Sequence, residues 1–414
     1  MGQVQTRIKF EGQQAEALEK IRRWVRAHAN RVPGTPQKFV LFGFAGSGKS
    51  TLAGEVARHV PSQGVCLAGK AAIEMSHKGI EASTIHSFCY RPNMTEEGLL
   101  LGYNLRDKPE NPINLIIPDE CGMINTELDN DLMSFGLPML VMGDPFQLPP
   151  VEGTSPYEGI KPDYQLTDIV RQAKDNPVIM MSMTVREGRD LKIGRYGDSR
   201  VITKAVAKQH IEKLIIDHQG DSKIIVGRNI TRTRLNRKAR RIFEFKSEFP
   251  EMGETLICLK NERSRGLFNG QIWEVADSYG PIEFKCHYMA RNYRTGEQEL
   301  RKSYWGPDEP GPTGHQVTVQ CVVLTLSSQD DPTIKVEVAV PTAYFNGNPD
   351  ELHWKQKVAT SAFDFGYVLT CHKAQGSTFR NVFVFDEGYI FGDMWSRWRY
   401  SAMTRPSGNL IMAI

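Results

Sequence analysis

The stretch GFAGSGKS, residues 43–50, has the residue types and spacing of a loop that binds phosphate groups. It fits the pattern G-x-x-x-x-G-K-[ST], in which glycines let backbone N–H groups approach phosphate oxygens. Lys49 would reach the β- and γ-phosphates, and Ser50 would ligate magnesium. The apolar run KFVLFGF precedes the loop and a helical pattern begins near Lys49, which is the context that the motif requires. A glycine-rich turn with a chance lysine is the other interpretation.

Two carboxylates come directly after the apolar run NLIIP. Asp119 and Glu120 would project from the end of a strand, where α/β sheets bind their ligands. Asp119 would hold magnesium, and Glu120 would accept a proton from the water that attacks the γ-phosphate. An acidic turn after a strand is the alternative for this pair alone, and the glycine loop upstream favours the catalytic interpretation.

A second polar stretch, GDPFQLPP, follows the apolar run LPMLVM. It places Asp144 and Gln147 at another strand end, beside Glu120. The amide of Gln147 can donate and accept, so it could contact the γ-phosphate or orient water, although a surface turn is the alternative. Together these features predict a P-loop nucleotide hydrolase.

Strands and helices must together position these residues. Short apolar runs such as VCLAG, KIIVG, YVLTC and NLIMAI alternate with helical patterns, which predicts an α/β fold with doubly wound parallel sheets. At 414 residues the chain is long enough for several domains. The segment between residues 88 and 113 is rich in turn formers, and residues 279–354 contain alternating stretches such as HQVTVQCVVLTL that predict antiparallel β-structure.

Composition limits the classes of function. A net charge of +3, from 51 Lys and Arg against 48 Asp and Glu, is too small an excess to indicate a nucleic-acid partner by itself. The seven cysteines are scattered without CxxC spacing, so we expect them reduced and mostly buried rather than bound to zinc. No apolar run is long enough to span a bilayer and the amino terminus lacks a signal-peptide core, so we expect no membrane contact and a cytoplasmic protein, in a host cytoplasm if viral.

The glycine loop resembles the first of a series of superfamily 1 helicase motifs that recur here in order and spacing. The others are ASTIHSF (82–88), PDE (118–120), GDPFQLPPV (143–151), LTCHKAQGST (369–378) and YSAMTR (400–405). Within that superfamily the chain is most similar to the 1B group, which includes the Dda helicase of T-even bacteriophages and the RecD-like helicases. The resemblance implies an ATP-dependent DNA helicase that moves 5′ to 3′ on single-stranded DNA and unwinds duplex DNA in replication or recombination.

The resemblance also implies two RecA-like motor domains, each carrying an insertion. The expected parts are motor domain 1A at 1–87 and 112–185, a turn-rich or β insertion 1B at 88–111, motor domain 2A at 186–279 and 355–414, and an SH3-like β-rich insertion 2B at 280–354. The first insertion would act as the wedge or pin that splits the fork, with Tyr90 or Tyr103 stacking at the junction. The second would brace it.

For ATP and Mg²⁺, the resemblance assigns roles residue by residue. The Q-motif glutamine that reads the adenine edge falls on Gln14, with Gln13 a possible shift of register. Arg171 and Arg405 match the arginines that stabilise charge on the transferred phosphate when the domains close, and a surface ion pair is the alternative for either. The expected catalytic residues are Lys49, Glu120, Gln147, Arg171 and Arg405; the expected nucleotide contacts are Gln14, Gly43, Gly46, Ser47, Gly48, Lys49, Ser50, Thr51 and Gly376; the expected metal ligands are Ser50 and Asp119.

The strand-binding residues would grip a phosphate backbone or stack on bases, with little sequence preference. They are Lys70, Ser83, Thr84, His86, Thr370, His372 and Lys373. Lys70 lies in AGKAA, where related proteins commonly have proline and threonine, and His86 is alternatively a hydrogen-bonded core histidine. The basic segment from Arg228 is either a solvated helix face or a border of the nucleic-acid track. Trp395, Trp398 and Tyr400 are interpreted as packing residues.

We expect a monomer that binds single-stranded and forked duplex DNA, together with a single-strand-binding protein or a replisome component. Two other functions stay open. The chain could be an ATP-regulated protein that binds or loads onto single-stranded nucleic acid without unwinding, or an RNA-directed helicase of the same superfamily. A P-loop kinase would not account for HKAQG and MTR.

Overall fold

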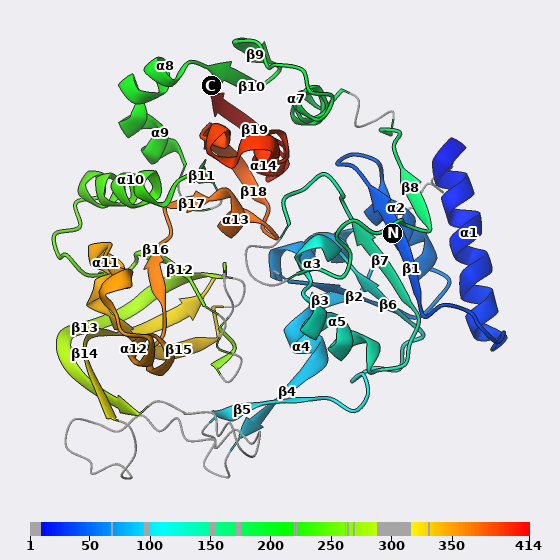
Figure 1. Cartoon of the computed structure of the whole chain (residues 1–414), viewed down its shortest axis with the longest axis horizontal. Coiled ribbons are helices and arrows are strands. Elements are labelled where there is room, and N and C mark those ends of the chain that lie inside the picture. The colour runs from blue at the N-terminus through cyan, green and yellow to red at the C-terminus, as the bar shows by residue number, and fades with distance from the viewer. Residues whose placement is uncertain are drawn as a thin grey trace, which may run out of the picture. The chain divides into compact units, whose positions relative to one another are not determined.

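The structure is a computed structural model, whose helices and strands are labelled in Figure 1. The chain divides into two compact units. The first unit comprises Met1–Asn93, Tyr103–Gln209 and Ala374–Ile414, and the second comprises Met94–Gly102 and His210–Lys373. The structure describes residues 10–67, 69–94, 100–149, 154–170, 175–218, 220, 222–260, 262, 265–267, 270–287, 316–329 and 332–414.

A parallel six-stranded sheet forms the centre of the first unit, in the order β3-β2-β6-β7-β1-β8. Its strands are β1 (Lys38–Gly43), β2 (Ser62–Cys66), β3 (Ala82–Thr84), β6 (Leu115–Pro118), β7 (Met139–Gly143) and β8 (Tyr164–Leu166). The predicted α/β fold with a parallel sheet is confirmed. Because parallel strands end at the same edge, residues that follow β1, β6 and β7 lie along one side of the sheet.

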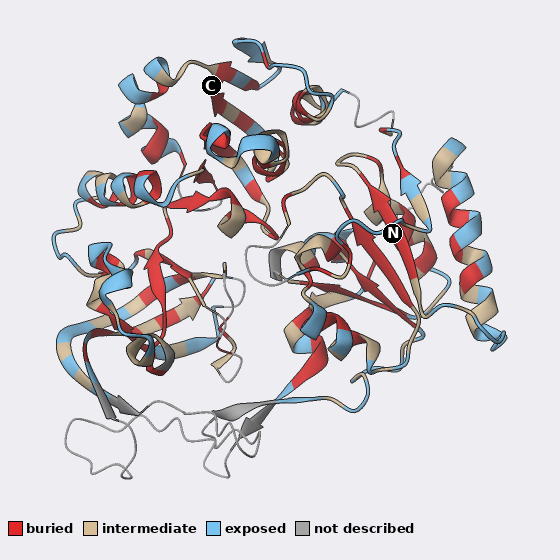
Figure 2. Ribbon diagram, viewed as in Figure 1, coloured by how far each residue is buried: buried red, intermediate tan, exposed pale blue. Residues whose placement is uncertain are grey.

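Helices cover both faces of this sheet, and the strands are accordingly buried on both sides (Figure 2). Along β1, Phe39 and Leu41 pack into one core, whereas Val40 and Phe42 pack into the other. This alternation is why the strand reads as a continuous apolar run. The helices are α1 (Gly12–Ala29), α2 (Lys49–Ala57), α3 (Gly69–His77), α4 (Ile85–Cys89), η1 (Cys121–Met123) and α5 (Thr126–Met133).

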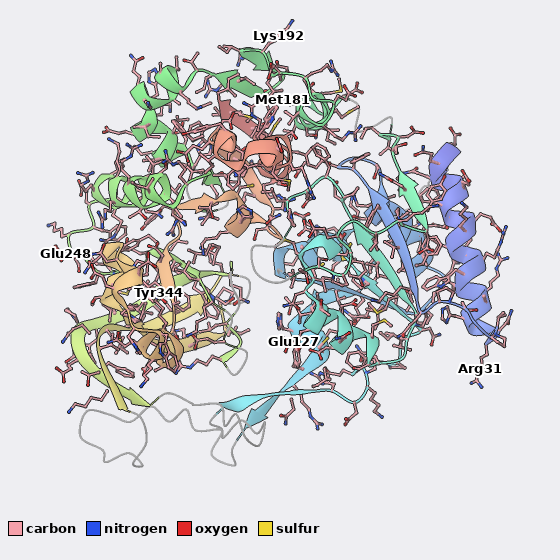
Figure 3. The ribbon with its side chains drawn as sticks, viewed as in Figure 1. Arg31, Glu127, Met181, Lys192, Glu248 and Tyr344 are labelled. Carbon is pink, nitrogen blue, oxygen red and sulfur yellow. The ribbon has the colours of Figure 1, made fainter. Side chains whose placement is uncertain are left out.

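The first unit also holds strands and helices from later in the chain. Strand β18 (Phe379–Phe385) runs parallel to β19 (Pro406–Ala413), β19 runs parallel to β10 (Ser199–Ile202), and β10 is antiparallel to β9 (Gly194–Tyr196). The accompanying helices are α7 (Pro177–Arg186), α8 (Lys204–Gln209), η4 (Gly388–Met394) and α14 (Trp395–Met403). Helix α14 packs against α7, whose Met181 is buried and is labelled in Figure 3.

The second unit combines a parallel strand pair with an antiparallel sheet. Strand β11 (Lys223–Val226) pairs with β17 (Val368–Thr370), beside helices α9 (Ile211–Asp217) and α10 (Asn229–Ile242). The antiparallel sheet has five strands in the order β15-β14-β13-β12-β16. They are β12 (Thr255–Cys258), β13 (Ile272–His287), β14 (Gln316–Ser328), β15 (Lys335–Pro341) and β16 (Phe363–Phe365).

The antiparallel sheet extends beyond the expected insertion at residues 280–354, because its strand β12 comes before that range and its strand β16 comes after it. Its core includes Trp273 and Phe363, and Tyr344, labelled in Figure 3, packs against that core. The remaining helices are α11 (Thr342–Asn346), η3 (Pro349–Glu351), α12 (Trp354–Ala359) and α13 (Cys371–Ala374).

The segment expected to form the first insertion contains a two-stranded sheet of β4 (Tyr90–Met94) and β5 (Leu100–Leu105). Tyr90 is buried and its hydroxyl donates to the Asp131 carboxylate, so its ring is not available for the expected stacking on a base. The side chain of Tyr103 lies outside the described residues.

Six cysteines among the described residues are free and buried, as expected: Cys66, Cys89, Cys121, Cys258, Cys321 and Cys371. Within the described part of the chain, no helix combines the length and apolar character that a membrane span requires.

Candidate ATP site and strand-binding residues

The glycine loop connects β1 to α2 with backbone conformations that only glycine adopts easily. Gly46 and Gly48 have φ angles of +76° and +86°, in the left-handed region. A Cβ atom at Gly48 would lie 2.1 Å from Nε2 of Gln14, and one at Gly43 would lie 2.5 Å from Oγ of Ser47. Glycine is therefore favoured in this loop both by the left-handed backbone and because neighbouring side chains leave no room for a Cβ atom.

The lysine and hydroxyls of the loop lie where the motif predicts. Lys49 is the first residue of α2, and its ammonium donates to the carbonyl oxygens of Gly43 and, at 3.3 Å, of Phe44. Ser50 and Thr51 follow in the first turn, whose backbone N–H groups have no partner inside the helix. The ammonium is thus held at the loop by two neutral acceptors that a phosphate would outcompete.

The two glutamines at the start of α1 have different partners. Nε2 of Gln14 donates to the carbonyl oxygen of Ser47 at 2.9 Å, so this side chain lies against the glycine loop. Oε1 of Gln13 accepts from the backbone N–H groups of Thr167 at 2.8 Å and Asp168 at 3.1 Å. Gln13 therefore ties α1 to the chain after β8, whereas Gln14 contacts the predicted nucleotide site.

The acidic pair follows β6 directly. The N–H of Asp119 donates to Val65, and Oδ1 of Asp119 accepts from the N–H of Glu120 at 2.8 Å. Burial and the neighbouring charge of Glu120 raise the pKa of Asp119 to about 6, against the opposing effect of Lys49. Glu120 has a φ of 50°, a left-handed conformation that costs a residue other than glycine about 1–3 kcal/mol. Such strain is typical of functional positions.

Arg405, which follows α14, contacts this acidic pair. Its Nη1 lies 3.1 Å from Oε1 of Glu120, while Nε donates to the carbonyl oxygen of Ser401 at 3.0 Å and Nη2 to Oγ1 of Thr404 at 3.3 Å. The Arg405 side chain is 3 % exposed and that of Glu120 is 25 % exposed. The arginine expected to act on the phosphate is therefore paired with the carboxylate expected to act as base.

The polar segment after β7 is organised by Asp144. Its Oδ1 accepts from the N–H of Phe146 at 3.0 Å, and the N–H of Gln147 donates to the Asp144 carbonyl oxygen at 3.3 Å. Nε of Arg397, on α14, donates to the carbonyl oxygen of Gln147 at 3.1 Å. The backbone of Gln147 is thus held through its N–H by Asp144 and through its carbonyl oxygen by Arg397.

Residues from the HKAQG and YSAMTR motifs fix the next position, Leu148. Its N–H donates to Oγ of Ser401 at 2.8 Å, and its carbonyl oxygen accepts from Nε2 of Gln375 at 2.6 Å. Gly376 has a φ of +73°, and a Cβ atom there would lie 3.5 Å from Oε2 of Glu120. Both motifs therefore reach the acidic strand ends.

Sequence reasoning missed four residues of this site. They are Gln375, Arg397, Tyr400 and Ser401, of which Tyr400 had been assigned to packing alone. They could have been found from the sequence, because Gln375 lies in HKAQG and the other three lie in the helix that precedes Arg405.

Two family models match the chain, in the order of these motifs. One described as an AAA domain matches residues 25–207, and one described as a UvrD-like helicase C-terminal domain matches residues 365–413. The first range contains the glycine loop and both acidic strand ends, and the second contains Arg405. The chain therefore combines an AAA domain with a UvrD-like helicase C-terminal domain, which is the domain content of an ATP-driven helicase enzyme.

Solved structures of Pif1 helicases align with nearly the whole length of this chain. A pair described as unwinding forked duplex DNA has a TM-score of 0.46 at 14% identity, and Bacteroides Pif1 bound to single-stranded DNA has 0.44 at 14%; each comparison covers 98% of this chain and 92% of the other. Pif1 from Candida albicans has a TM-score of 0.39 at 17% identity, covering 99% and 96%. No curated protein matches the chain.

The first group of predicted strand-binding residues lies where β3 meets α4. Oγ1 of Thr84 caps α4 by accepting from the N–H of Ser87 at 3.1 Å, and Oγ of Ser83 accepts from Gln63 at 3.3 Å. The ring of His86 stacks on that of Tyr90 with centroids 5.8 Å apart. These side chains therefore already have structural contacts, and their role in strand binding stays a prediction.

The second group lies at the end of β17 in the second unit. Thr370 is buried, and His372 and Lys373 follow it in α13. Burial lowers the pKa of His372, so its ring is neutral at neutral pH. Only Lys373 of this group would then bring a full charge to a phosphate. Arg171 lies outside the described residues, as does the side chain of Lys70 on α3.

The basic segment from Arg228 forms α10, and two of its arginines are buried in ion pairs. Arg232 lies 2.6 Å from Asp364, and Arg240 lies 2.8 Å from Glu254. Burial of Asp364 raises its pKa, against the opposing charge of Arg232. Part of the positive charge of this helix is therefore paired inside the second unit and is not available to nucleic acid.

Proposed function

We propose that this protein is a superfamily 1B helicase that moves 5′ to 3′ along single-stranded DNA and unwinds duplex DNA at forks, in replication or recombination, using Mg²⁺-ATP. The observation that carries the proposal is the 3.1 Å contact between Arg405 and Glu120. It joins the acidic strand end of the first predicted motor domain to the arginine of the second. DNA as the substrate, and the direction, are supported by the resemblance of STIHS and HKAQG to the 1B motifs.

The ATP step follows from exchanges of partners within the site. When triphosphate enters the loop, Lys49 leaves the carbonyls of Gly43 and Phe44 for phosphate oxygens. Arg405 then moves from Glu120 to the γ-phosphate, because a multiply charged phosphate is the stronger acceptor. This transfer frees the Glu120 carboxylate to take a proton from the attacking water. The ion pair therefore keeps the base occupied until substrate is present.

Magnesium fits the oxygen donors at this place. Asp119 provides a carboxylate whose raised pKa a nearby cation would lower again, and Ser50 provides a hydroxyl. Mg²⁺ is commonly held by one or two carboxylates together with substrate phosphates, and bound there it would neutralise charge on the β- and γ-phosphates. Among the described residues no three-residue His, Cys, Asp and Glu cluster could hold a metal alone, which agrees with a site that nucleotide completes.

Coupling to DNA would come from the same exchange. Each motor domain supplies part of the ATP site, so binding and hydrolysis change the free energy of bringing them together. If each domain's grip on the strand alternates with that change, the strand advances in one direction. Splitting of the fork is assigned to the β4–β5 insertion, and the β-rich insertion would brace it.

A forked-substrate assay tests the proposal. Two fluorescent forks with the same duplex are compared, one with a 5′ single-stranded tail and one with a 3′ tail, in the presence of ATP and Mg²⁺. We expect strand separation from the 5′ tail only, lost on chelation of Mg²⁺ and in Lys49→Ala. The control Lys78→Ala, an exposed lysine of the same unit, should unwind normally.

The other outcomes separate the alternatives. Unwinding from the 3′ tail would reverse the assigned direction. ATP hydrolysis stimulated by single strands without any strand separation would indicate a loading protein. Stimulation by RNA but not by DNA of the same sequence would indicate an RNA-directed helicase.

A further inference from the structure

A single buried phenol connects the glycine loop to the polar segment that carries Gln147. The hydroxyl of Tyr400 accepts from the N–H of Ala45 at 2.8 Å and donates to Oδ2 of Asp144 at 2.6 Å. Tyr400 is 1 % exposed, and its ring meets that of Phe146 edge to face with centroids 5.2 Å apart. The hydroxyl is therefore fixed by ring packing, and it fixes both of its partners.

Each hydrogen-bond partner of the Tyr400 hydroxyl lies close in sequence to residues that are expected to act on phosphate. Ala45 is inside the loop, between Gly43 and Gly46. Asp144 orders the turn that positions Gln147 through the bonds to Phe146 and Gln147 described above. Burial and the charge of Asp144 raise the pKa of Tyr400 well above its usual value, so the hydroxyl keeps the proton that it donates.

The helix that carries Tyr400 also positions the arginine. Ser401, the next residue, binds Leu148 through its hydroxyl and Arg405 through its carbonyl oxygen. On the neighbouring helix α7, the guanidinium of Arg186 lies 3.8 Å from the centroid of the Phe44 ring. Two consecutive loop residues, Phe44 and Ala45, are thus each held by a side chain from α7 or α14.

We propose that Tyr400 is a positioning residue for ATP hydrolysis, whose hydroxyl sets the glycine loop, Asp144 and the helix bearing Arg405 at the spacing in which Arg405 and Gln147 reach the same phosphate. The inference deepens the proposed function and rests on it. Without the hydroxyl, the Ala45 N–H and the Asp144 carboxylate lose their shared partner, and the loop and α14 can separate. ATP binding itself depends mainly on Lys49 and the loop backbone, so it should change little.

The test compares Tyr400→Phe, which keeps the ring and removes the hydroxyl, with a matched control. Tyr157→Phe removes the hydroxyl of another buried tyrosine in the same unit, one that also donates to an aspartate, Asp129, but does not contact the loop. We expect Tyr400→Phe to lower kcat of DNA-stimulated ATP hydrolysis about tenfold while KM for ATP changes less than threefold. Tyr157→Phe should lower Tm comparably and leave kcat within twofold.

A double variant shows whether Tyr400 acts through Arg405. In the Arg405→Ala background, Tyr400→Phe should add less than a twofold loss, because the group that it positions is gone. An unchanged kcat in Tyr400→Phe, an equal loss in the control, or a full tenfold loss in the double variant would each overturn the inference.

If Tyr400→Phe does not fold, Asp144→Ala removes the acceptor of the Tyr400 hydroxyl and should give the same selective fall in kcat. The activity of the wild-type protein distinguishes a failure of the proposed function from a failure of the proposed role of Tyr400. A wild-type protein that neither hydrolyses ATP in response to DNA nor unwinds a fork refutes the proposed function, whereas an active wild type with fully active variants refutes only the role of Tyr400.

Discussion

Replacement of Arg405 by alanine should damage catalysis far more than folding. The variant loses the charged contact to Glu120 and the bonds to Ser401 and Thr404. A hydrogen bond to a charged group contributes about 1.5–3 kcal/mol, and the larger loss of about 3–5 kcal/mol applies when the abandoned charge is fully buried. Glu120 is 25 % exposed, so water can solvate it and the smaller figure applies. Tm should therefore fall by only a few degrees.

The catalytic loss is of a different size. An arginine that stabilises a transferring phosphate contributes about 10³ to 10⁵ in kcat, or about 4–7 kcal/mol. We expect kcat of Arg405→Ala to fall at least 10³-fold with nucleotide affinity nearly unchanged. Arg405→Lys should be intermediate, because an ammonium keeps the charge but cannot contact Glu120 and Ser401 together.

The assay is steady-state ATP hydrolysis at saturating single-stranded DNA, with affinity measured separately by titration of a fluorescent ADP. Arg189→Ala is the matched control, because Arg189 forms an exposed ion pair with Glu187 in the same unit. A kcat within tenfold of wild type would refute the assigned role. A loss of nucleotide affinity as large as the loss of kcat would also refute it, since that pattern indicates uniform binding.

Three further predictions follow from the loop and from the second strand-binding group. Gly48→Ala should weaken ADP binding more than tenfold in the same titration, because its Cβ would lie 2.1 Å from the Gln14 amide at a φ of +86°; unchanged affinity would contradict the loop geometry. Lys373→Gln should reduce the salt dependence of single-strand binding by about 0.7 in log K against log salt, measured by fluorescence anisotropy, whereas the neutral His372 should leave the slope unchanged when replaced by glutamine. The pKa of His372 is lower in the folded state than its usual value of 6.5. Near and below pH 6.5 the unfolded chain therefore binds more protons than the folded chain, and the free energy of unfolding falls as the pH drops through 6.5. The fall in Tm from pH 7.5 to pH 5.5 should be smaller in His372→Gln, and an equal fall in both proteins would show that His372 does not contribute.

The arrangement of the acidic strand ends was predictable because it depends on one general property of parallel sheets. Asp119 and Asp144 follow β6 and β7, which are neighbours in the sheet, and the glycine loop follows β1 on the other side of β7. Apolar runs followed by polar residues are enough to predict that these positions share an edge. The fold class is confirmed, and the predicted helicase motifs fall within the two matched domains, while the individual site roles stay predictions.

The partner of Arg405 depends on tertiary packing that no local pattern contains. Glu120 and Arg405 are 285 positions apart, and their contact depends on how α14 is placed. The same holds for Tyr400, whose ring was correctly predicted to pack but whose hydroxyl contacts were missed. In a motif whose arginine is expected to contact phosphate, the hydroxyl of a tyrosine should be tested as well as its ring.

The basic helix α10 shows how spacing could have improved the prediction. Arg232, Asn236 and Arg240 recur every four residues and are all buried, so they share one helix face. That face was recognisable from the sequence as a stripe with Leu235 and Ala239. Its charge partners, by contrast, come from β16 and from the segment before β12, which a helix pattern cannot locate.

The most direct test of the account is the rate of ATP hydrolysis by the wild-type protein with and without a single-stranded DNA oligonucleotide. We predict a strong rise in rate on addition of DNA and no hydrolysis above background in Lys49→Ala under either condition. Hydrolysis that is the same with and without any polynucleotide would contradict it, because the ATP site would then be uncoupled from a strand.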